Sequence, residues 1–381
     1  MKTVSAIIGA SYGDEGKGLI TDYLANKFTS SAVVRFNGGA QAGHTVQLED
    51  GRRHVFHHFG SGTFCKSATI LSRFFIVNPI LFFKEATELL PMLTDQIEVF
   101  VDPEALVTTP FDVYINQAVE KQRGNLRHGS CGIGISETIE RNEQGFPLMV
   151  YDLAASGLRD RLEKIQNTYF PERLLQLGLE INEEDKILLK SAIDTFISDS
   201  QLFLDVVSIL SDQKAIKLFD NIIFEGAQGL RLDQYGNDFP YVTRSSTGLE
   251  NVATLIKNFE ASIDVYYVTR TYLTRHGAGP LLNEYKNPLN IEDKTNIPND
   301  FQGTLRFAPL DFETMWQCVD KDKKFLNGRE FNTIGVITCC DQHSFPADDL
   351  PKLVNNVKDA LGTENIITSW GPTRETIYNE Q

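Results

Sequence analysis

The segment "GASYGDEGKG", from Gly9 to Gly18, carries the residue types that most directly suggest chemistry. In a standard phosphate loop, GxxxxGK[ST], backbone N–H groups and the Lys hold phosphates, and the Ser or Thr binds Mg²⁺. Here the spacing to the Gly-Lys pair is longer, and Gly18 stands where the Ser or Thr is expected. Asp14 supplies a hard oxygen for Mg²⁺ instead. We therefore predict a nucleotide site unlike that of an ordinary phosphate-loop kinase. The structural alternative is a strand-to-helix turn with acidic caps.

A second glycine-rich segment, "FNGGAQAGHT", places His44 in a tight loop. Its three glycines allow the backbone to approach a ligand closely. A lone His is more often a structural residue, but after such a loop His44 is a candidate donor to a phosphoryl or oxyanion group. His57 and His58, in "VFHHFGSG", have no such setting, and we predict structural roles for them.

Short apolar runs alternate with helical patterns along the chain. Strands are expected in "TVSAIIG", "SAVVRF", "IEVFVD", "NIIFEGAQG", "VYYVTRTYL" and "TIGVITCCD", and a helix in "KGLITDYLANKF". This alternation predicts an α/β fold with a large, mostly parallel central sheet flanked by helices, similar to phosphate-loop NTPases, with ligands beyond the carboxyl ends of the strands. Residues 153–219 are charged and helical in pattern, so we predict a helical insertion that covers the site, within one domain of residues 1–381.

The composition is that of an ordinary globular protein, since 41% of the 381 residues are hydrophobic and 23% are charged. The formal net charge of −15 argues against a general nucleic-acid binder, whose affinity depends on Lys and Arg. No apolar run reaches the roughly 18–20 residues that span a bilayer, and the first residues lack a secretory pattern, so we expect a cytoplasmic protein without membrane contact. The five cysteines show no CxxC spacing, which favours reduced thiols over a metal site.

Five segments together resemble, in order and spacing, the adenylosuccinate synthetase family. They are "GASYGDEGKG", "GGAQAGHT", "FEGAQGLRLDQYGNDFPYVTRSS", "TRHGAGP" and "WGPTRET". The resemblance runs from the first strand to the last residues and is interrupted near residues 153–219 and 284–302. It implies a ligase that joins L-aspartate to C6 of a 6-oxopurine nucleotide, using a nucleoside triphosphate and Mg²⁺. It also implies a homodimer that takes only small-molecule substrates.

The resemblance assigns roles to individual residues. Asp14 matches the general base that removes the purine N1 proton and also binds the metal; His44 matches the general acid; and the Gly43 carbonyl matches a second metal ligand. The positions that match triphosphate-binding residues are Gly13, Glu15, Gly16, Lys17, Gly18, Gly43, Thr45, Asp341, Ser369, Gly371 and Pro372. Those that match residues for the purine nucleotide are Gln41, Ala42, Ser130, Cys131, Arg141, Gln228 and Thr243. Those that match aspartate-binding residues are Gly303, Thr304 and Arg306.

Several positions depart from the family pattern. Gln41 stands for an Asn, and Ser130 with Cys131 stands for a pair of threonines that bind the substrate phosphate. Arg141 is the candidate for an arginine that the family sends into the partner's site. The aspartate loop is normally rich in arginine, but "FQGTLRFAPLD" keeps only Arg306, which can still hold a carboxylate with two N–H groups.

The base-reading motif also departs from the family. In "TCCDQ", Cys339 replaces a Lys while Asp341 remains, which puts GTP preference in doubt and makes ATP an option. Asp14 is retained, whereas the phage-type branch of the family often replaces the catalytic Asp, and on this ground the resemblance favours IMP, L-aspartate and GTP as substrates. The alternative is dGMP, L-aspartate and ATP, as in the phage-type branch that makes N6-succino-2-amino-2'-deoxyadenylate. A non-catalytic nucleotide-binding regulator is disfavoured, because such a protein has no use for both Asp14 and His44.

Overall fold

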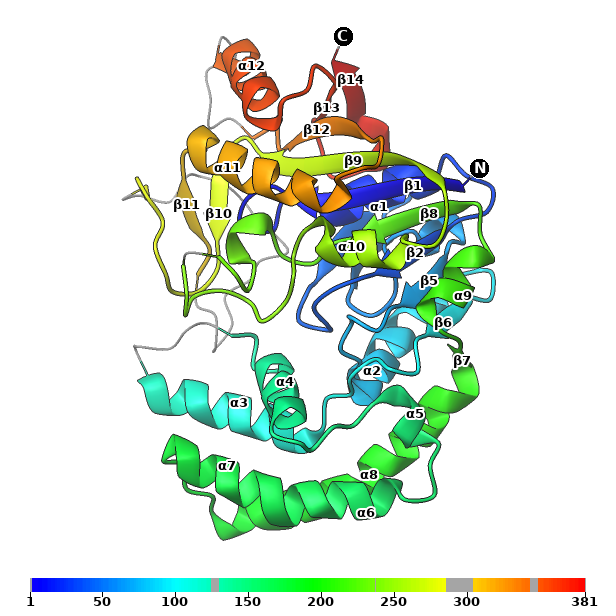
Figure 1. Ribbon diagram of the computed structural model, residues 1–381, viewed down its shortest axis with the longest axis vertical. Helices are drawn as coiled ribbons and strands as arrows, with labels where there is room; N and C mark the ends of the chain where they lie inside the picture. Colours follow the sequence, from blue (N-terminus) through cyan, green and yellow to red (C-terminus); the bar gives the residue numbers. More distant parts are fainter. Residues whose placement is uncertain (1, 125–129, 237, 286–303, 343–348, 381) are drawn as a thin grey trace.

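The computed structural model describes the whole chain except residues 1, 125–129, 237, 286–303, 343–348 and 381. Its centre is a ten-stranded sheet with the order β14-β13-β12-β9-β1-β8-β2-β5-β6-β7 (Figure 1). The strands of this sheet are β1 (Lys2–Gly9), β2 (Ala32–Arg35), β5 (Ala68–Leu71), β6 (Val99–Val101), β7 (Ser208–Ile209), β8 (Asn221–Glu225), β9 (Ala261–Arg270), β12 (Asn332–Thr338), β13 (Ile366–Ser369) and β14 (Ile377–Glu380). All neighbours pair in parallel except β13 and β14. The predicted fold class, a large and mostly parallel sheet, is confirmed.

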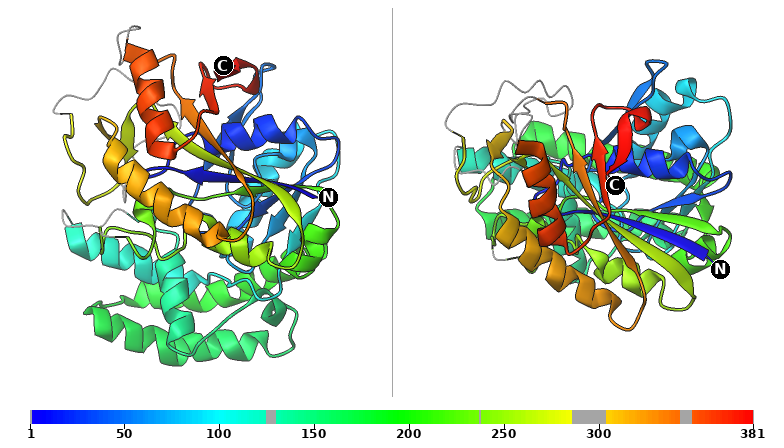
Figure 2. Two further views of the ribbon diagram at one scale, coloured as in Figure 1. Left: turned by 45° about the horizontal axis from the view of Figure 1, so that its top comes forward. Right: turned by 90° about the horizontal axis from the view of Figure 1, so that it is seen from above.

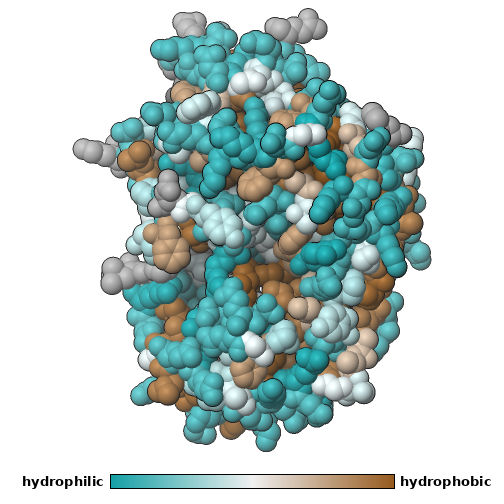
Figure 3. All heavy atoms as spheres, in the orientation of Figure 1, coloured by the Kyte–Doolittle hydropathy of each residue, from teal (hydrophilic) through white to brown (hydrophobic). Residues whose placement is uncertain are grey.

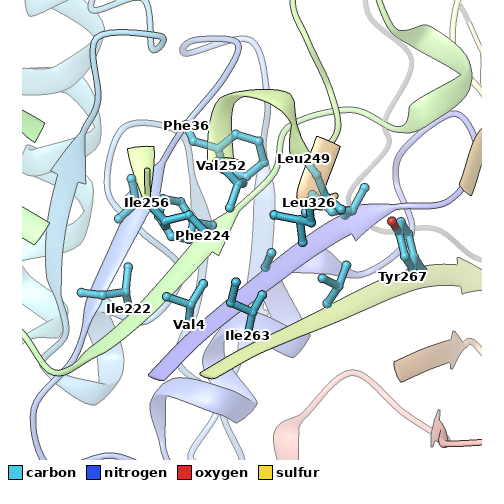
Figure 4. Close-up of a cluster of buried hydrophobic side chains, with 14 of the residues drawn as sticks. Val4, Phe36, Ile222, Phe224, Leu249, Val252, Ile256, Ile263, Tyr267 and Leu326 are labelled. Atoms are coloured by element: carbon cyan, nitrogen blue, oxygen red, sulfur yellow. The ribbon is translucent and has the colours of Figure 1, made fainter. Parts of the chain in front are cut away.

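The strands predicted from apolar runs all form, although "VYYVTRTYL" is divided between β9 and the short strand β10 (Leu273–Arg275). β10 pairs with β11 (Arg306–Ala308), and β3 (His44–Gln47) pairs with β4 (Arg53–Phe56), in two small antiparallel sheets. The central strands are buried on both faces, which accounts for their continuous apolar sequences. Val4 of β1 lies between Ile222 and Ile263 of the adjacent strands in the core (Figure 4).

Helices cover both faces of the sheet. These helices are α1 (Lys17–Ala25), α2 (Pro79–Leu89), α9 (Asp212–Lys217), α10 (Leu249–Leu255), α11 (Phe312–Lys323) and α12 (Leu350–Leu361). Alternate residues of β1 face opposite sides: Val4 packs with α9–α12, whereas Ile7 packs with α1. Figure 2 shows α1 on one side of the sheet and α11 and α12 on the other. The predicted helix at residues 17–28 is thus α1, which ends at Ala25.

A second, helical layer lies beside one end of the sheet (Figure 1). It consists of α3 (Pro110–Arg123), α4 (Ile135–Glu143), α5 (Val150–Leu153), α6 (Leu158–Lys164), α7 (Phe170–Leu177) and α8 (Glu183–Val206). Short helical turns are η1 (Thr63–Cys65), η2 (Leu90–Met92), the π-helical η4 (Ile165–Tyr169), η5 (Leu230–Leu232), η6 (Lys324–Leu326) and η8 (Arg374–Thr376). Figure 3 shows polar side chains over most of one face and apolar side chains in a recess between the sheet and this layer.

The helical layer differs in extent from the predicted insertion at residues 153–219. It already begins with α3 and α4, while β7 and α9, near the end of that range, belong to the main sheet and its core. Its apolar cluster includes Leu71 and Val101 of the sheet as well as Phe196 of α8. The sheet and the helical layer thus share an apolar cluster, and the single domain stays a prediction. No helix in the described ranges is long and apolar enough to cross a membrane.

Candidate functional site

A cavity of about 840 Å³ lies where the loops that follow the central strands meet the helical layer. Loops that follow neighbouring parallel strands meet at one edge, which is where ligands bind in such sheets. The structure brings most of the predicted residues together here. The predicted residues that line the cavity are Gly13, Asp14, Glu15, Gly16, Lys17, Gly18, Gln41, Ala42, Gly43, His44, Thr45, Ser130, Cys131, Gln228 and Thr243.

The loop after β1 is held by an inward-facing carboxylate. Glu15 is buried, accepts a hydrogen bond from the Ser11 N–H at 2.6 Å, and lies 3.9 Å from the Lys17 ammonium. Burial raises the pKa of Glu15 to about 7 and lowers the pKa of Lys17. A side chain at Gly9 would meet the Glu15 carboxylate at 2.2 Å, so only glycine fits there. Glu15 therefore shapes the loop and keeps Lys17 in place, an indirect contribution to phosphate binding.

Asp14 occupies a left-handed backbone conformation with φ 54°, between two glycines at positive φ. Its carboxylate is about a third exposed, at 32%, and lines the cavity. The His276 Nε2 atom lies 3.5 Å from Asp14 Oδ2, and the Arg270 guanidinium donates to the Asp14 carbonyl. Asp14 thus presents a hard oxygen to the cavity, as the sequence predicts. His276 was not predicted, although it lies in the "TRHGAGP" segment that the resemblance singles out.

His44 is fixed by a buried carboxylate at the end of β8. Its Nδ1 atom lies 2.7 Å from Glu225 Oε1, and Arg35 lies 3.2 Å from Glu225 Oε2. Burial alone would raise the pKa of Glu225, but His44 and Arg35 hold it at about 2. Burial lowers the pKa of His44 to about 4, against the attraction of Glu225. Near neutral pH His44 is therefore uncharged, with Nδ1–H donating to ionised Glu225 and with Nε2 free of the proton.

Two amide side chains offer hydrogen-bond acceptors to a ligand. Gln228 is at φ 58°, a left-handed conformation, and its backbone packs against Gly13. Within the described residues, Gln41 Oε1 and Gln228 Oε1 are buried atoms without a hydrogen-bond partner. Because a buried acceptor without a donor is unfavourable, both oxygens are suited to donor groups of a bound molecule.

Ser130 and Cys131 also face the cavity but differ in what they can offer. The Asn116 amide donates to Ser130 Oγ at 2.9 Å. Burial raises the pKa of the Cys131 thiol to about 12, and its Sγ donates weakly to the Gln41 carbonyl at 3.8 Å. Cys131 is therefore a neutral thiol that ties two loops together, and Ser130 is the better donor for a phosphate.

The prediction for Arg141 is wrong. Its side chain is fully buried, and its N–H groups donate to both Asp112 carboxylate oxygens and to the carbonyls of Phe146 and Val107. These bonds hold α4 against α3 and leave Arg141 no path to a cavity or to another subunit. The sequence could not show this. In a helix with many charged residues, an arginine that is buried and paired with a carboxylate has the same sequence surroundings as an exposed arginine.

Two of the three predicted aspartate-binding residues, Thr304 and Arg306, do not line the cavity. Arg306 donates to both Glu284 carboxylate oxygens through Nε and NH2, and its NH1 donates to the carbonyls of Gly277 and Gly279. Thr304 is exposed and does not line the cavity, and Gly303 lies outside the described residues. The role of these residues stays a prediction, and Arg306 can meet a substrate carboxylate with two N–H groups only if Glu284 moves away.

The predicted triphosphate residues near the C-terminus do not line the cavity. They are Asp341, Ser369, Gly371 and Pro372, at the carboxyl ends of β12 and β13. The Cys340 N–H donates to the Ser369 carbonyl at 3.0 Å. Thr338, the last residue of β12, donates to the Glu15 carbonyl at 2.8 Å. Thr338 thus connects the end of β12 to the loop after β1, and the triphosphate role of the four residues stays a prediction.

Comparison with known proteins adds a family and a fold. The adenylosuccinate synthetase family model matches residues 6–304. The adenylosuccinate synthetase of Picrophilus torridus is 31% identical over 279 residues, which cover 72% of this chain and 64% of the relative. That of Thermoplasma acidophilum is 27% identical over 392 positions, covering 98% and 87%. The chain thus spans less than two thirds of the first of these relatives.

Two solved structures share the fold. A fully ligated adenylosuccinate synthetase from Plasmodium falciparum matches with a TM-score of 0.75 at 18% identity and covers 100% of both chains. The succinoaminodeoxyadenylate synthetase of cyanophage S-2L, bound to dGMP and to dATP as an energy donor, matches with a TM-score of 0.65 at 17% identity, over 100% of this chain and 95% of that one. At such identities the likeness establishes the fold alone.

Proposed function

The chain belongs to the adenylosuccinate synthetase family, and on this basis we propose that it is a ligase joining L-aspartate to C6 of a 6-oxopurine nucleotide. The leading form of the reaction is IMP, L-aspartate and GTP giving adenylosuccinate, a step of purine nucleotide biosynthesis. The observation that carries the proposal is that Asp14, Lys17 and His44 line one cavity at the carboxyl edge of the sheet. A base, a phosphate-binding cation and an acid are the groups that this chemistry needs.

The first step begins at Asp14. Its carboxylate removes the N1 proton of the purine, and electron density moves to O6. O6 then attacks the γ-phosphorus of the triphosphate, the bond to the nucleoside diphosphate breaks, and a 6-phosphoryl purine forms. In the second step the amine of aspartate attacks C6, inorganic phosphate leaves, and the amine gives up its proton. Because phosphate is a much better leaving group than hydroxide, the two steps replace one difficult substitution.

His44 and Lys17 stabilise negative charge during these steps. With Nδ1–H held by Glu225, the Nε2 atom of His44 is the one available to the reacting oxygen. A phosphoryl group in the cavity raises the affinity of Nε2 for a proton. The protonated Nε2 can then hydrogen-bond to O6 and to the phosphoryl group and stabilise the charge that develops on them. The buried Lys17 ammonium supplies a fixed positive charge for the triphosphate.

We propose that Mg²⁺ is the cofactor and that Asp14 and the Gly43 carbonyl hold it. Both residues line the cavity, and one carboxylate with one carbonyl is a donor set that Mg²⁺ accepts when phosphate oxygens and waters complete its shell. When bound, the ion neutralises triphosphate charge. The φ of 54° at Asp14 turns this carboxylate toward the cavity while Glu15 faces inward, and this supports the assignment.

A second candidate reaction uses dGMP and ATP in place of IMP and GTP. The 2-amino group of a guanine nucleotide is a donor that IMP lacks, and the unpartnered oxygens of Gln41 and Gln228 favour such a donor. Cys339, where the family has a base-contacting Lys, also favours a triphosphate other than GTP. A regulator without ligase activity is the least favoured reading, because it would need neither the Asp14 base nor the His44–Glu225 pair.

The proposal includes a cytoplasmic homodimer that takes only small-molecule substrates, as the family resemblance implies. Arg141 is not the residue that reaches the partner's site, because it is buried within its own subunit.

A substrate matrix tests the proposal. IMP, dIMP, GMP and dGMP are each combined with ATP, dATP or GTP, in the presence of L-aspartate and Mg²⁺, and phosphate release is measured. We expect IMP with GTP to give the highest rate. Highest turnover with dGMP and ATP or dATP supports the second reaction, and tight nucleotide binding without turnover in any combination supports the regulator.

A further inference from the structure

One face of α3 looks into the cavity, although no chemistry was predicted for it. Asn116, Val119, Glu120 and Arg123 all line the cavity, at the spacing of one helical face. Of these, Asn116 makes two hydrogen bonds to the segment that connects α3 and α4. Its amide nitrogen donates to Ser130 Oγ at 2.9 Å, and its Oδ1 accepts from the Gly134 N–H at 3.1 Å.

We propose that Asn116 is a positioning residue that turns the Ser130 hydroxyl toward the phosphate of the bound purine nucleotide. The inference deepens the proposed function and rests on it, because it takes a nucleotide as the molecule in the cavity. Asn116 would then help the protein to distinguish a nucleotide from the nucleoside that lacks its phosphate.

The directions of the two hydrogen bonds carry the argument. A backbone N–H can only donate, so the Gly134 bond fixes the oxygen of the Asn116 amide toward Gly134. The nitrogen of the same amide must then face Ser130, where it can only donate. Ser130 Oγ accepts this bond, and its single proton is left to be donated elsewhere. Accepting a bond also strengthens the hydroxyl as a donor.

The residues that follow Ser130, as far as Gly134, are held closely enough to keep this geometry. Gly134 begins α4 at φ 86°, and a side chain there would meet the Val113 nitrogen of α3 at 2.8 Å. Gln117, the neighbour of Asn116, donates to the Gly132 carbonyl at 2.9 Å. Gln117 thus anchors the same segment through its backbone without touching the Ser130 hydroxyl, and it does not line the cavity. This difference provides a matched control.

The experiment compares the binding of a nucleotide with that of its nucleoside by calorimetry. The probes are IMP with inosine and dGMP with deoxyguanosine, and the pair whose nucleotide the wild-type protein binds more tightly is used. We expect Asn116→Ala to weaken nucleotide binding about tenfold, because Ser130 loses the bond that directs its proton toward a charged group. Nucleoside binding should stay within twofold of wild type, and so should nucleotide binding by Gln117→Ala.

A double mutant shows whether Asn116 acts through Ser130. Ser130→Ala should weaken nucleotide binding as much as Asn116→Ala, and the double variant should be no weaker than Ser130→Ala alone. Among the kinetic parameters, KM for the nucleotide should rise while kcat changes by less than threefold. If Asn116→Ala does not fold, Asn116→Asp keeps the acceptor for Gly134 and removes the donor to Ser130, and the same loss of nucleotide over nucleoside binding is expected.

Three results would overturn the inference. Equal losses for nucleotide and nucleoside would mean that Asn116 only supports the shape of the cavity. Additive losses in the double variant would mean that it does not act through Ser130. Unchanged nucleotide binding in Asn116→Ala would remove it from recognition, and in these three cases the proposed function stands. A wild-type protein that binds neither IMP nor dGMP would instead overturn the proposed function and the inference together.

Discussion

His44 and Glu225 form a buried hydrogen bond of 2.7 Å between residues that lie 181 positions apart in the sequence. His44 begins β3 beside the cavity, and Glu225 ends β8, so that the pair connects the glycine-rich loop to the central sheet. Arg35 binds the second oxygen of the same carboxylate and balances its charge in the core. The pair fixes both the orientation and the proton position of the imidazole, which a general acid requires.

Replacing Glu225 with Gln should lower kcat by about 10²-fold while KM for the nucleotide changes by less than threefold. The Gln oxygen can still accept from His44 Nδ1, but it carries no charge to stabilise the imidazolium that forms in the transition state. Steady-state kinetics with the preferred nucleotide measures the effect. His44→Asn should lose at least as much, and the double variant should lose no more. A kcat within threefold of wild type for Glu225→Gln would show that the carboxylate does not assist His44.

Replacing Asp14 with Asn should abolish measurable turnover. Loss of a positioned general base typically costs ~10²–10⁴-fold, and weakened metal binding adds to this. Asn tolerates the left-handed conformation at this position, so the loop should keep its shape and bind nucleotide. Single-turnover phosphate release, together with nucleotide binding by calorimetry, separates the two effects. Near-normal release would remove Asp14 from the mechanism.

Much of the fold follows from the sequence, because the central strands are continuous apolar runs with loops at their ends. The glycines and charged residues of "GASYGDEGKG" likewise indicate where phosphate binds. The strands β3, β4, β5, β7, β11, β13 and β14, each of two to four residues, were not predicted. No roles were predicted for Glu225, His276 and Asn116 either. They contact His44, Asp14 and Ser130, which lie far away in the sequence or in another segment, and such contacts are visible only in the folded chain. Arg141 failed for the same reason.

Arg306→Lys should raise KM for aspartate at least tenfold. Lysine keeps the charge but loses the planar pair of N–H groups that matches a carboxylate. In the structure this pair is taken by Glu284, so aspartate must compete with an internal carboxylate. Glu284→Gln should therefore lower KM for aspartate or leave it unchanged, and steady-state titration of aspartate distinguishes the two variants. An equal KM for wild type and Arg306→Lys would place the amino-acid site elsewhere, with Arg275 the next candidate.

The contribution of Asp322 to thermal stability should fall as the pH rises from about 4 to 7. Burial raises the pKa of Asp322 to about 7, against the hydrogen bonds that it accepts from the Leu249 N–H and the Tyr267 hydroxyl. A carboxyl whose pKa is higher in the folded chain than its ordinary value of 3.8 contributes stability that is complete below about pH 4 and is lost as the pH approaches 7. Burial raises the pKa values of Glu15 and Asp22 to about 7 as well, with the same sign.

Asp322→Asn provides the test of this pH dependence. The amide keeps both hydrogen bonds, since its oxygen accepts from Leu249 and its nitrogen donates to the Tyr267 oxygen. The decline of Tm between pH 4 and 7 should therefore be smaller in this variant than in wild type. Asp320→Asn, at an exposed position on the same helix, should leave the decline unchanged. A decline in Asp322→Asn equal to that of wild type would show that the buried carboxyl does not titrate in this range.

The 2-amino group separates the two leading reactions. With IMP as the natural substrate, we predict that kcat/KM for IMP exceeds that for dGMP more than tenfold. A buried acceptor left without its donor costs roughly 1–3 kcal/mol. A cavity with an acceptor for the 2-amino group would therefore bind IMP poorly. A cavity built for IMP would instead leave the 2-amino group of dGMP without a partner. Gln41 is the residue to vary, because its buried oxygen lacks a partner within the described residues and the family has Asn there.

Gln41→Leu removes that acceptor at similar volume. If IMP is the substrate, the variant should change kcat/KM for IMP by less than threefold, because C2 of IMP carries only hydrogen. If the 2-amino group binds to Gln41, the same variant should reduce kcat/KM for dGMP by tenfold or more and leave IMP unaffected. A wild-type preference for dGMP over IMP, lost in Gln41→Leu, would replace the IMP reaction with the 2-aminopurine reaction and would make Gln41 the residue that decides between them.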